Sequence, residues 1–178
     1  MNSRIEIILG SMYSGKSTEL IRRLSCYDAI KFPTLLINHE YDTRTGNSVK
    51  THSNLKKNAI KTDSLMKLVE RPEYINSKVI GIDEAQFFGD LLEFVKYSEL
   101  DKIIIISGLD GDYNRKPFGQ ILECIPLCDS VVKLKAMDMV YNDGTPGIFT
   151  KRLTKNDNIL LIGSKEHYVS VCRENYFN

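Results

Sequence analysis

The chain has 178 residues, of which 42% are hydrophobic and 26% charged, and its formal net charge is +1. This composition excludes a disordered chain, and the near balance of charges gives no reason to expect a nucleic-acid partner. No stretch approaches the roughly 18 apolar residues that a membrane-spanning helix needs, and the four cysteines are too scattered for a disulfide framework, which favours a reducing cytoplasmic setting.

Short apolar runs alternate with helical or polar segments along the chain. Apolar residues three and four apart predict helices at 17–30, 64–70 and 89–98. Near-continuous apolar runs are typical of strands covered on both faces, so the alternation favours an α/β fold with a mostly parallel sheet. Segments 38–58 and 141–147 are rich in polar or turn-forming residues and are expected to be irregular. The predicted strands are 5–9, 34–37, 79–82, 103–106, 131–132 and 159–162.

The first predicted strand ends in a glycine-containing loop that precedes a predicted helix. Residues 10–17 read G-S-M-Y-S-G-K-S, which is the P-loop pattern in its expected strand–loop–helix context. Its glycines let backbone N–H groups turn toward a phosphate, and the helix N-terminus adds partial positive charge. We expect Lys16 to reach the β- and γ-phosphates of ATP and Ser17 to ligate Mg²⁺. The predicted ATP-binding residues are Gly10, Ser11, Met12, Tyr13, Ser14, Gly15, Lys16 and Ser17.

Two acids, Asp83 and Glu84, follow the predicted strand 79–82. An aspartate at the end of such a strand is where P-loop enzymes hold Mg²⁺, often through water. The adjacent Glu84 is expected to point to another side of the strand end, where it can act as a base on a substrate hydroxyl or on water. A RecA-like ATPase, which activates water and needs no nucleoside pocket, therefore stays open as an alternative at this point.

Five segments, in order and spread over nearly the whole chain, together resemble the type II thymidine kinases, and the chain is most similar to the short poxvirus-like form. The resemblance implies transfer of the γ-phosphoryl group of ATP to the 5′-hydroxyl of thymidine. It implies Glu84 as the base, Ser17 and Asp83 as the residues that organise magnesium, and Lys16 as a charge-balancing group. The segments are G-S-M-Y-S-G-K-S-T-E-L-I-R-R (10–23), I-G-I-D-E-A-Q-F-F (80–88), L-D-G-D-Y-N-R-K-P-F-G (109–119), V-V-K-L-K-A (131–136) and I-G-S-K-E-H-Y-V-S-V-C-R (162–173).

The same resemblance implies a thymine pocket with an apolar and aromatic wall, closed by a late lasso-like loop. Tyr113 stands where the family usually has phenylalanine. Arg44, Arg115 and Lys116 are candidate phosphate or loop contacts, although single basic side chains are more often solvated. The predicted thymidine-binding residues are Met12, Phe87, Leu109, Tyr113, Phe118, Thr150, Ile159, Leu160, Leu161, Ile162, Gly163 and Tyr168.

The chain departs from the family at the structural zinc site, which two C-x-x-C pairs normally form. Asp138 and Tyr141 stand in place of the first pair, and Cys172 is left with Asn175 in the second. Because structural zinc sites are closed four-ligand sites, we expect no zinc here, and whether Asp138 with Cys172 holds any metal stays open. Packing of apolar side chains is expected to anchor the lasso instead. The residues proposed for that packing are Met137, Met139, Val140 and Tyr141.

These inferences predict a P-loop, RecA-like kinase domain at 1–136 and a small lasso subdomain at 137–178. The resemblance implies a cytoplasmic homotetramer that binds ATP and thymidine and is inhibited by dTTP. Two alternatives stay open. One is a related deoxynucleoside kinase with shifted base specificity, because the lasso recognises the base largely through its backbone. The other is a nucleotide-binding protein that has lost turnover, against which the retained Lys16, Ser17, Asp83 and Glu84 argue.

Overall fold

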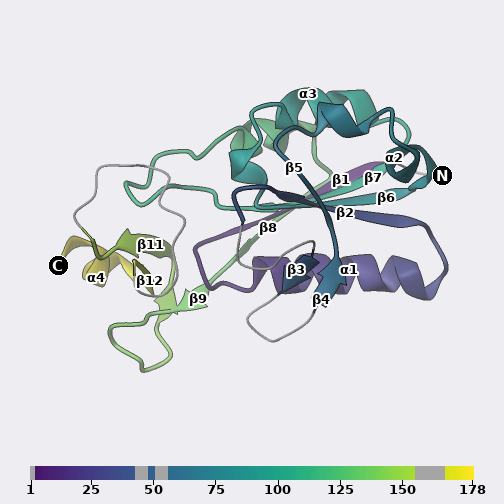
Figure 1. The fold of residues 1–178 in the computed structure, drawn as a ribbon. Coiled ribbons are helices and arrows are strands. Elements are labelled where there is room, and N and C mark those ends of the chain that lie inside the picture. The colour runs from purple at the N-terminus through teal and green to yellow at the C-terminus, as the bar shows by residue number, and fades with distance from the viewer. Residues whose placement is uncertain (1–2, 43–47, 51–55, 155–166) are drawn as a thin grey trace.

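A six-stranded sheet forms the central layer of the computed structural model, which describes residues 3–42, 48–50, 56–154 and 167–178 (Figure 1). Its order is β5-β2-β6-β7-β1-β8, and each neighbouring pair is parallel. The predicted α/β fold with a mostly parallel sheet is therefore confirmed. The strands are β1 (Arg4–Gly10), β2 (Thr34–His39), β5 (Ile60–Thr62), β6 (Val79–Asp83), β7 (Ile103–Gly108) and β8 (Ser130–Leu134).

Helices lie on both faces of this sheet (Figure 1). One face is covered by α1 (Lys16–Ala29), and the other by α3 (Leu91–Ser98) and the short α2 (Pro72–Asn76). Short 3₁₀ helices also occur in this part of the chain, at Met66–Leu68, Ala85–Phe87 and Ile121–Leu127. None of the helices in the described ranges is long and apolar enough to cross a membrane.

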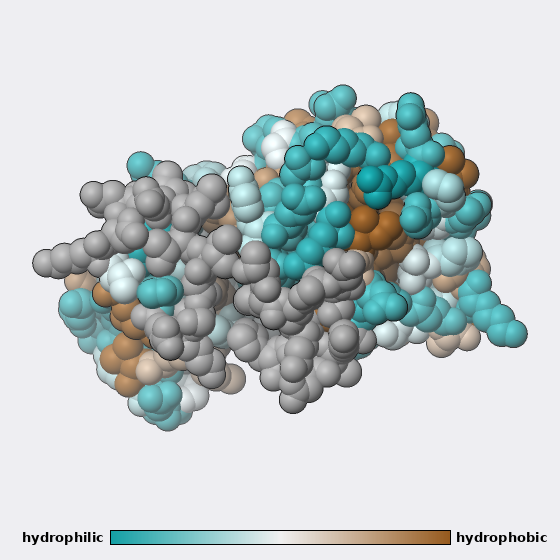
Figure 2. Space-filling view, viewed as in Figure 1, coloured by the Kyte–Doolittle hydropathy of each residue, from teal (hydrophilic) through white to brown (hydrophobic). Residues whose placement is uncertain are grey.

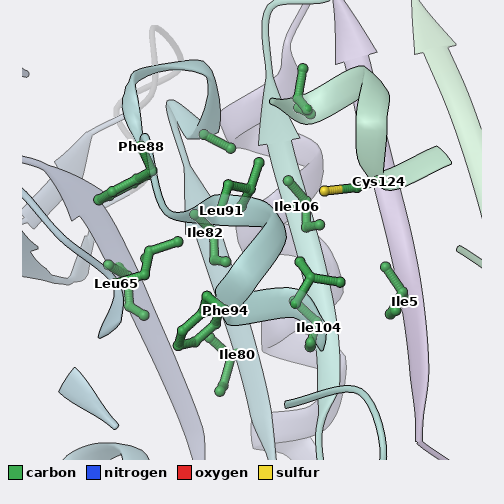
Figure 3. Close-up of a cluster of buried hydrophobic side chains, with 14 of the residues drawn as sticks. Ile5, Leu65, Ile80, Ile82, Phe88, Leu91, Phe94, Ile104, Ile106 and Cys124 are labelled. Carbon is green, nitrogen blue, oxygen red and sulfur yellow. The ribbon is translucent and has the colours of Figure 1, made fainter. Parts of the chain in front are cut away.

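The two faces of the sheet bury separate sets of apolar side chains, since neighbouring residues of a strand point to opposite sides. On β1, Ile7 belongs to the cluster on the α3 side, whereas Ile8 belongs to the cluster on the α1 side. Figure 3 shows how Leu91 and Phe94 of α3 reach over the isoleucines of β6 and β7. Burial on both faces explains why these strands read as continuous apolar runs.

Two sequence-based predictions of secondary structure are wrong. The helix expected at 64–70 is only a 3₁₀ turn at Met66–Leu68, because Pro72 begins the next helix and Arg71 before it has extended backbone (φ −80°, ψ 145°). The Asp90 carboxylate accepts hydrogen bonds from Ser64 Oγ at 2.7 Å and from the Met66 amide at 3.0 Å, which caps the start of this turn. The segment 38–58, expected to be irregular, contains the end of β2 and an antiparallel pair. That pair consists of β3 (Ser48–Lys50) and β4 (Lys56–Asn58). The strand predicted at 159–162 lies outside the described residues.

Two small antiparallel pairs and a short helix follow the sheet and lie beyond the end of β8 (Figure 1). The first pair is β9 (Ala136–Met137) with β10 (Pro146–Gly147), so the turn-rich segment 141–147 is irregular up to its last two residues. The second is β11 (Phe149–Arg152) with β12 (Tyr168–Val171), followed by α4 (Arg173–Phe177). We call these elements the C-terminal hairpins.

The prediction that apolar packing anchors the C-terminal hairpins is wrong for three of the four proposed residues. Met137, Val140 and Tyr141 have 64%, 57% and 44% of their surface exposed. Hydrophobic surface is visible over these hairpins at the left of Figure 2. These three side chains therefore do not anchor the hairpins, whose buried apolar residues are others, among them Val171.

Candidate nucleotide and nucleoside site

The loop between β1 and α1 has the form of a phosphate cradle. β1 ends at Gly10 and α1 begins at Lys16, as the P-loop pattern predicts. Tyr13 (φ 64°) and Gly15 (φ 86°) adopt the left-handed conformation that turns the loop back on itself. Lys16 Nζ donates to a carbonyl oxygen of the same loop at 2.8 Å, which places the ammonium group at the cradle. Among the described residues, the buried hydroxyl of Ser14 finds no hydrogen-bond acceptor, which suits a phosphate oxygen at that point.

The C-terminal hairpins contact this loop directly. The backbone amide of Met12 donates to Thr150 Oγ1 at 3.0 Å. The hydroxyl of Tyr13 donates to the carbonyl oxygen of Tyr168 at 3.4 Å. Two predicted thymidine-binding residues, Thr150 and Tyr168, thus contact loop residues more than 130 positions earlier in the sequence and lie beside the phosphate cradle.

The carboxylate of Asp83 lies buried at the end of β6, with 2% of the residue exposed. Ser107 Oγ donates to its Oδ1 at 3.0 Å, whereas the buried Oδ2 has no hydrogen-bond partner within the described parts of the chain. Burial and the adjacent charge of Glu84 raise the pKa of Asp83, and the nearby hydroxyls of Ser17 and Ser107 offset only part of that rise. The Asp83 carboxylate and the nearby Ser17 hydroxyl are both oxygen ligands of the kind that Mg²⁺ prefers.

A magnesium ion here would take its other ligands from outside the protein. The described residues contain no group of three or more His, Cys, Asp or Glu side chains that could hold a metal. Magnesium in nucleotide sites is commonly bound by one or two protein oxygens together with substrate phosphates and water. The pair of Asp83 and Ser17 fits that pattern.

Glu84 has an unusual backbone conformation for a residue with a side chain. Its φ of 53° and ψ of 40° are left-handed, and it precedes the 3₁₀ helix Ala85–Phe87. Strain of this kind costs free energy and is concentrated at functional sites. The carboxylate is also held in place, because Gln86 Nε2 donates to Glu84 Oε2 at 2.7 Å. The Glu84 carboxylate therefore has a fixed position at the end of β6, next to Asp83, which a general base requires.

Gln86, which the sequence did not single out, positions this carboxylate. Its side chain is buried, and its Oε1 accepts the amide of Leu109 at 3.0 Å. Two glycines leave room for it. A Cβ at Gly108 would lie 2.6 Å from Gln86 Oε1, and one at Gly119 (φ 62°) would lie 2.2 Å from the Gln86 carbonyl oxygen. In the sequence, the one indication of this role was that Gln86 stands between the apolar residues Ala85 and Phe87, just after a buried strand.

Replacing Gln86 by leucine is expected to lower kcat about 10- to 100-fold, the usual cost of losing a residue that orients a site group. The physical reason is that Glu84 loses its hydrogen-bond donor while the ATP cradle is untouched, so the KM for ATP should change little. Steady-state kinetics would measure both. Gln120→Leu is the matched control, since Gln120 Oε1 accepts an amide hydrogen bond at 3.0 Å from Leu92, away from the acids. An equal loss of kcat in both variants would contradict the positioning role.

Aromatic side chains gather at two places in the predicted nucleoside site. The rings of Phe87 and Phe118 meet edge to face, with centroids 5.6 Å apart. The guanidinium of Arg152, which the sequence did not single out, lies 3.9 Å from the ring centroid of Tyr113 and 5.1 Å from that of Tyr168. The remaining predicted residues, Ile159, Leu160, Leu161, Ile162 and Gly163, lie outside the described part of the chain.

The basic residues proposed as phosphate or loop contacts behave differently from one another. The guanidinium of Arg115 lies 4.5 Å from the ring centroids of both Tyr176 and Phe177, so it binds the C-terminal helix α4. Lys116 is exposed, and Arg44 lies outside the described residues.

Comparisons with known proteins show which family this chain belongs to. A family model described as thymidine kinase matches residues 3–176. The thymidine kinase of sheeppox virus (strain KS-1) is 45% identical over 175 residues, which covers 97% of this chain and 96% of the relative. That of Yaba monkey tumor virus (strain VR587) is 45% identical, covering 99% and 98%. That of vaccinia virus (strain Western Reserve) is 40% identical, covering 98% and 97%.

Proposed function

This chain belongs to the thymidine kinase family, and from that premise we propose how its residues phosphorylate thymidine. Its activity is that of a kinase that transfers a phosphoryl group to thymidine, and ATP is the donor typical of the family. The proposal concerns the residues that hold the substrates and move the proton. The observation that carries it is Glu84, held by Gln86 in a strained conformation next to the buried Asp83.

Glu84 acts as the general base. The 5′-oxygen of thymidine attacks the γ-phosphorus of ATP, a new P–O bond forms, and the bond to the β-phosphate oxygen breaks to leave ADP. The hydroxyl proton passes to the carboxylate of Glu84, whose position the hydrogen bond from Gln86 supports. Phosphoryl transfer requires chiefly positioning and charge stabilisation, so few protein groups suffice.

The P-loop residues 10–17 hold the phosphates, with Lys16 as the cation near the transferred group. Ser17 and Asp83 are the residues that would hold magnesium, supported by the buried Asp83 Oδ2, for which the described residues supply no hydrogen-bond partner. When bound, that ion neutralises charge on the β- and γ-phosphates. The nucleoside side is formed by two aromatic groups and by the hairpin residues that contact Met12 and Tyr13. The proposed nucleoside residues are Met12, Phe87, Leu109, Tyr113, Phe118, Thr150, Tyr168 and 159–163.

The same proposal extends to the domain division, the cellular location, the oligomeric state and the inhibitor. We divide the chain into a kinase domain at 1–136 and a lasso subdomain at 137–178, supported by the separate pairing of the C-terminal hairpins. Family membership supports a cytoplasmic homotetramer in which dTTP competes for the thymidine site. The names of the relatives favour thymidine over another nucleoside, and the retained acid pair disfavours a protein without turnover.

The experiment that tests the function supplies purified protein and Mg-ATP with thymidine, deoxyuridine or deoxycytidine, and follows ADP and nucleoside monophosphate. Thymidine-dependent dTMP, formed in equal amount to ADP, is the expected result. Formation of ADP without nucleoside would instead point to an ATPase, and preference for another nucleoside would point to shifted specificity. Light scattering and dTTP inhibition at varied thymidine test the oligomer and the inhibitor.

A further inference from the structure

The carboxylate of Asp138 is the centre of a buried hydrogen-bond network at the base of the C-terminal hairpins. Only 1% of Asp138 is exposed. Its Oδ1 accepts the amides of Val140 and Tyr141, both at 2.8 Å. Its Oδ2 accepts the amide of Cys172 at 2.6 Å, and Asn175 Nδ2 lies 3.1 Å from both oxygens. Burial alone would raise the pKa of Asp138, but the hydrogen bonds from Cys172, Tyr141 and Asn175 outweigh it and hold the pKa well below its ordinary value.

These are the positions at which the family carries its zinc ligands, and they do not fit a zinc ion. A carboxylate has about four lone-pair sites, and four N–H donors already occupy them here. Tyr141 directs its hydroxyl to Glu174 instead of toward Asp138. One thiol, that of Cys172, is left, whereas a structural zinc site needs four ligands. The Asp138 carboxylate thus takes the central position with N–H donors around it, in place of a zinc ion with four ligands.

The network joins parts of the chain that are distant in sequence. Val140 and Tyr141 belong to the turn after β9, Cys172 follows β12, and Asn175 lies in α4. One carboxylate therefore fixes the end of β12 and the start of α4 to the turn after β9. Buried charge-assisted hydrogen bonds of this kind are among the strong ones in proteins.

From this network, a short series of contacts reaches the phosphate cradle. The amide of Met139, next to Asp138, donates to the carbonyl oxygen of Ser170 at 2.9 Å. The hydroxyls of Ser170 and Ser11 lie 3.1 Å apart, and each donates to the Gly147 carbonyl oxygen at 3.1 Å.

The same pair of strands carries the nucleoside contacts. Ser170 pairs with Thr150 across β11 and β12. Thr150 in turn accepts the amide of Met12. A shift at Asp138 would therefore displace the strands that contact the nucleoside side of the P-loop.

We propose that Asp138 is a positioning residue for nucleoside binding, which holds the C-terminal hairpins against the P-loop through its hydrogen bonds and without zinc. The inference rests on the nucleoside site proposed above, to which Thr150 and Tyr168 belong. It assigns to a carboxylate the part that a metal ion has elsewhere in the family. Lys16 Nζ donates to the Ser11 carbonyl oxygen and Asp83 accepts from Ser107, so these phosphate-side groups have partners of their own, and ATP binding should depend on Asp138 less than thymidine binding does.

The test compares Asp138→Asn with Asp143→Asn by steady-state kinetics and thermal unfolding. In Asp138→Asn an amide N–H replaces one acceptor and faces another donor, so the loss of about one charged hydrogen bond predicts an approximately tenfold rise in the KM for thymidine. The KM for ATP should rise less than the KM for thymidine, because the contacts from Asp138 reach the cradle through Ser170 and Thr150, which lie on the nucleoside side. Asp143 is an exposed residue of the same turn whose carboxylate bonds locally, accepting the amide of Thr145 at 2.9 Å, and its variant should match the parent.

A merely structural role would lower the active fraction, and with it kcat, without moving the KM for thymidine, and that result would overturn the proposal. Asn175→Ala, which removes one donor only, is measured in the same way if Asp138→Asn does not fold. A zinc-selective chelator should leave the parent's Tm unchanged, and a fall in Tm would overturn the metal-free anchor. Each outcome is separate from the function itself, which fails only if the parent lacks thymidine-dependent turnover.

Discussion

Replacing Glu84 by glutamine is expected to lower kcat for thymidine phosphorylation by about 100- to 10,000-fold, the usual contribution of a positioned general base. Glutamine has nearly the same shape and can still accept the hydrogen bond from Gln86, so the local backbone should survive. What it cannot do is take up the hydroxyl proton. Because the base acts only in the transition state, the KM values for ATP and thymidine should change little.

Initial rates with both substrates varied would measure this effect, and nucleotide binding by calorimetry would show that the ATP site persists. Glu93→Gln is the matched control, since Glu93 is an exposed residue of α3 on the outer surface. Its kcat should equal that of the parent. If Glu84→Gln kept more than about a tenth of the parent activity, a group other than Glu84 would have to remove the proton.

Replacing Asp83 by asparagine is expected to lower activity at limiting magnesium by more than about 100-fold, beyond the usual cost of losing an outer-shell group. The amide removes the negative charge and puts an N–H or a weaker oxygen at the position of Asp83 Oδ2, which no described residue hydrogen-bonds. Raising the magnesium concentration should recover part of the rate, which a defect in the base would not allow. Titrating activity against magnesium measures both the loss at limiting magnesium and the recovery at high magnesium.

Stability should respond to the same substitution in the opposite direction. Burial and the neighbouring Glu84 raise the pKa of Asp83 in the folded protein above its unfolded value. Its contribution to stability is therefore fully present below the unfolded pKa and is lost as pH rises through the folded pKa. The folded pKa of Asp83 is raised to about 6. At about pH 7.5 to 8 without magnesium, Asp83→Asn should therefore unfold at a Tm no lower than the parent's. Any difference in Tm between the variant and the parent should become smaller as the pH is lowered.

Ser107→Ala supplies the comparison for Asp83. It removes the hydroxyl that donates to Asp83 Oδ1 but leaves the carboxylate in place. Its activity should fall much less than that of Asp83→Asn, and its magnesium requirement should stay near the parent's. If both variants lost activity equally and magnesium rescued neither, Asp83 would be a structural residue of the strand end instead of a magnesium ligand.

The parts of the site that lie within one continuous segment could be predicted from sequence. The P-loop and the acid pair each occupy a few consecutive residues at the end of a strand, so strand and motif together place them. The sheet was predictable for a similar reason, because burial on both faces leaves long apolar runs. The helix at 64–70 could have been shortened in advance, since Pro72 follows it closely and disfavours helical backbone at Arg71.

The residues that the sequence missed act through partners far away in the chain. Gln86 is defined by its bonds to Glu84 and to the distant amide of Leu109, and Arg152 by the rings on either side of it. Asp138 was considered only as a lost zinc ligand. Its four donors come from two segments more than 30 residues apart, so no local pattern marks it as the centre of a network.

The hydrogen bond from the Met12 amide to Thr150 has a thermodynamic consequence. In the proposed site, Met12 belongs to the phosphate cradle and Thr150 to the nucleoside side, so the free energy of ordering one would depend on the order of the other. Binding of the two substrates then forms a closed cycle. Whatever factor bound ATP applies to the affinity for thymidine, bound thymidine must apply to the affinity for ATP. The hydrogen bond of the Met12 amide would thus couple the binding of ATP, the phosphoryl donor, to the binding of thymidine, the phosphoryl acceptor.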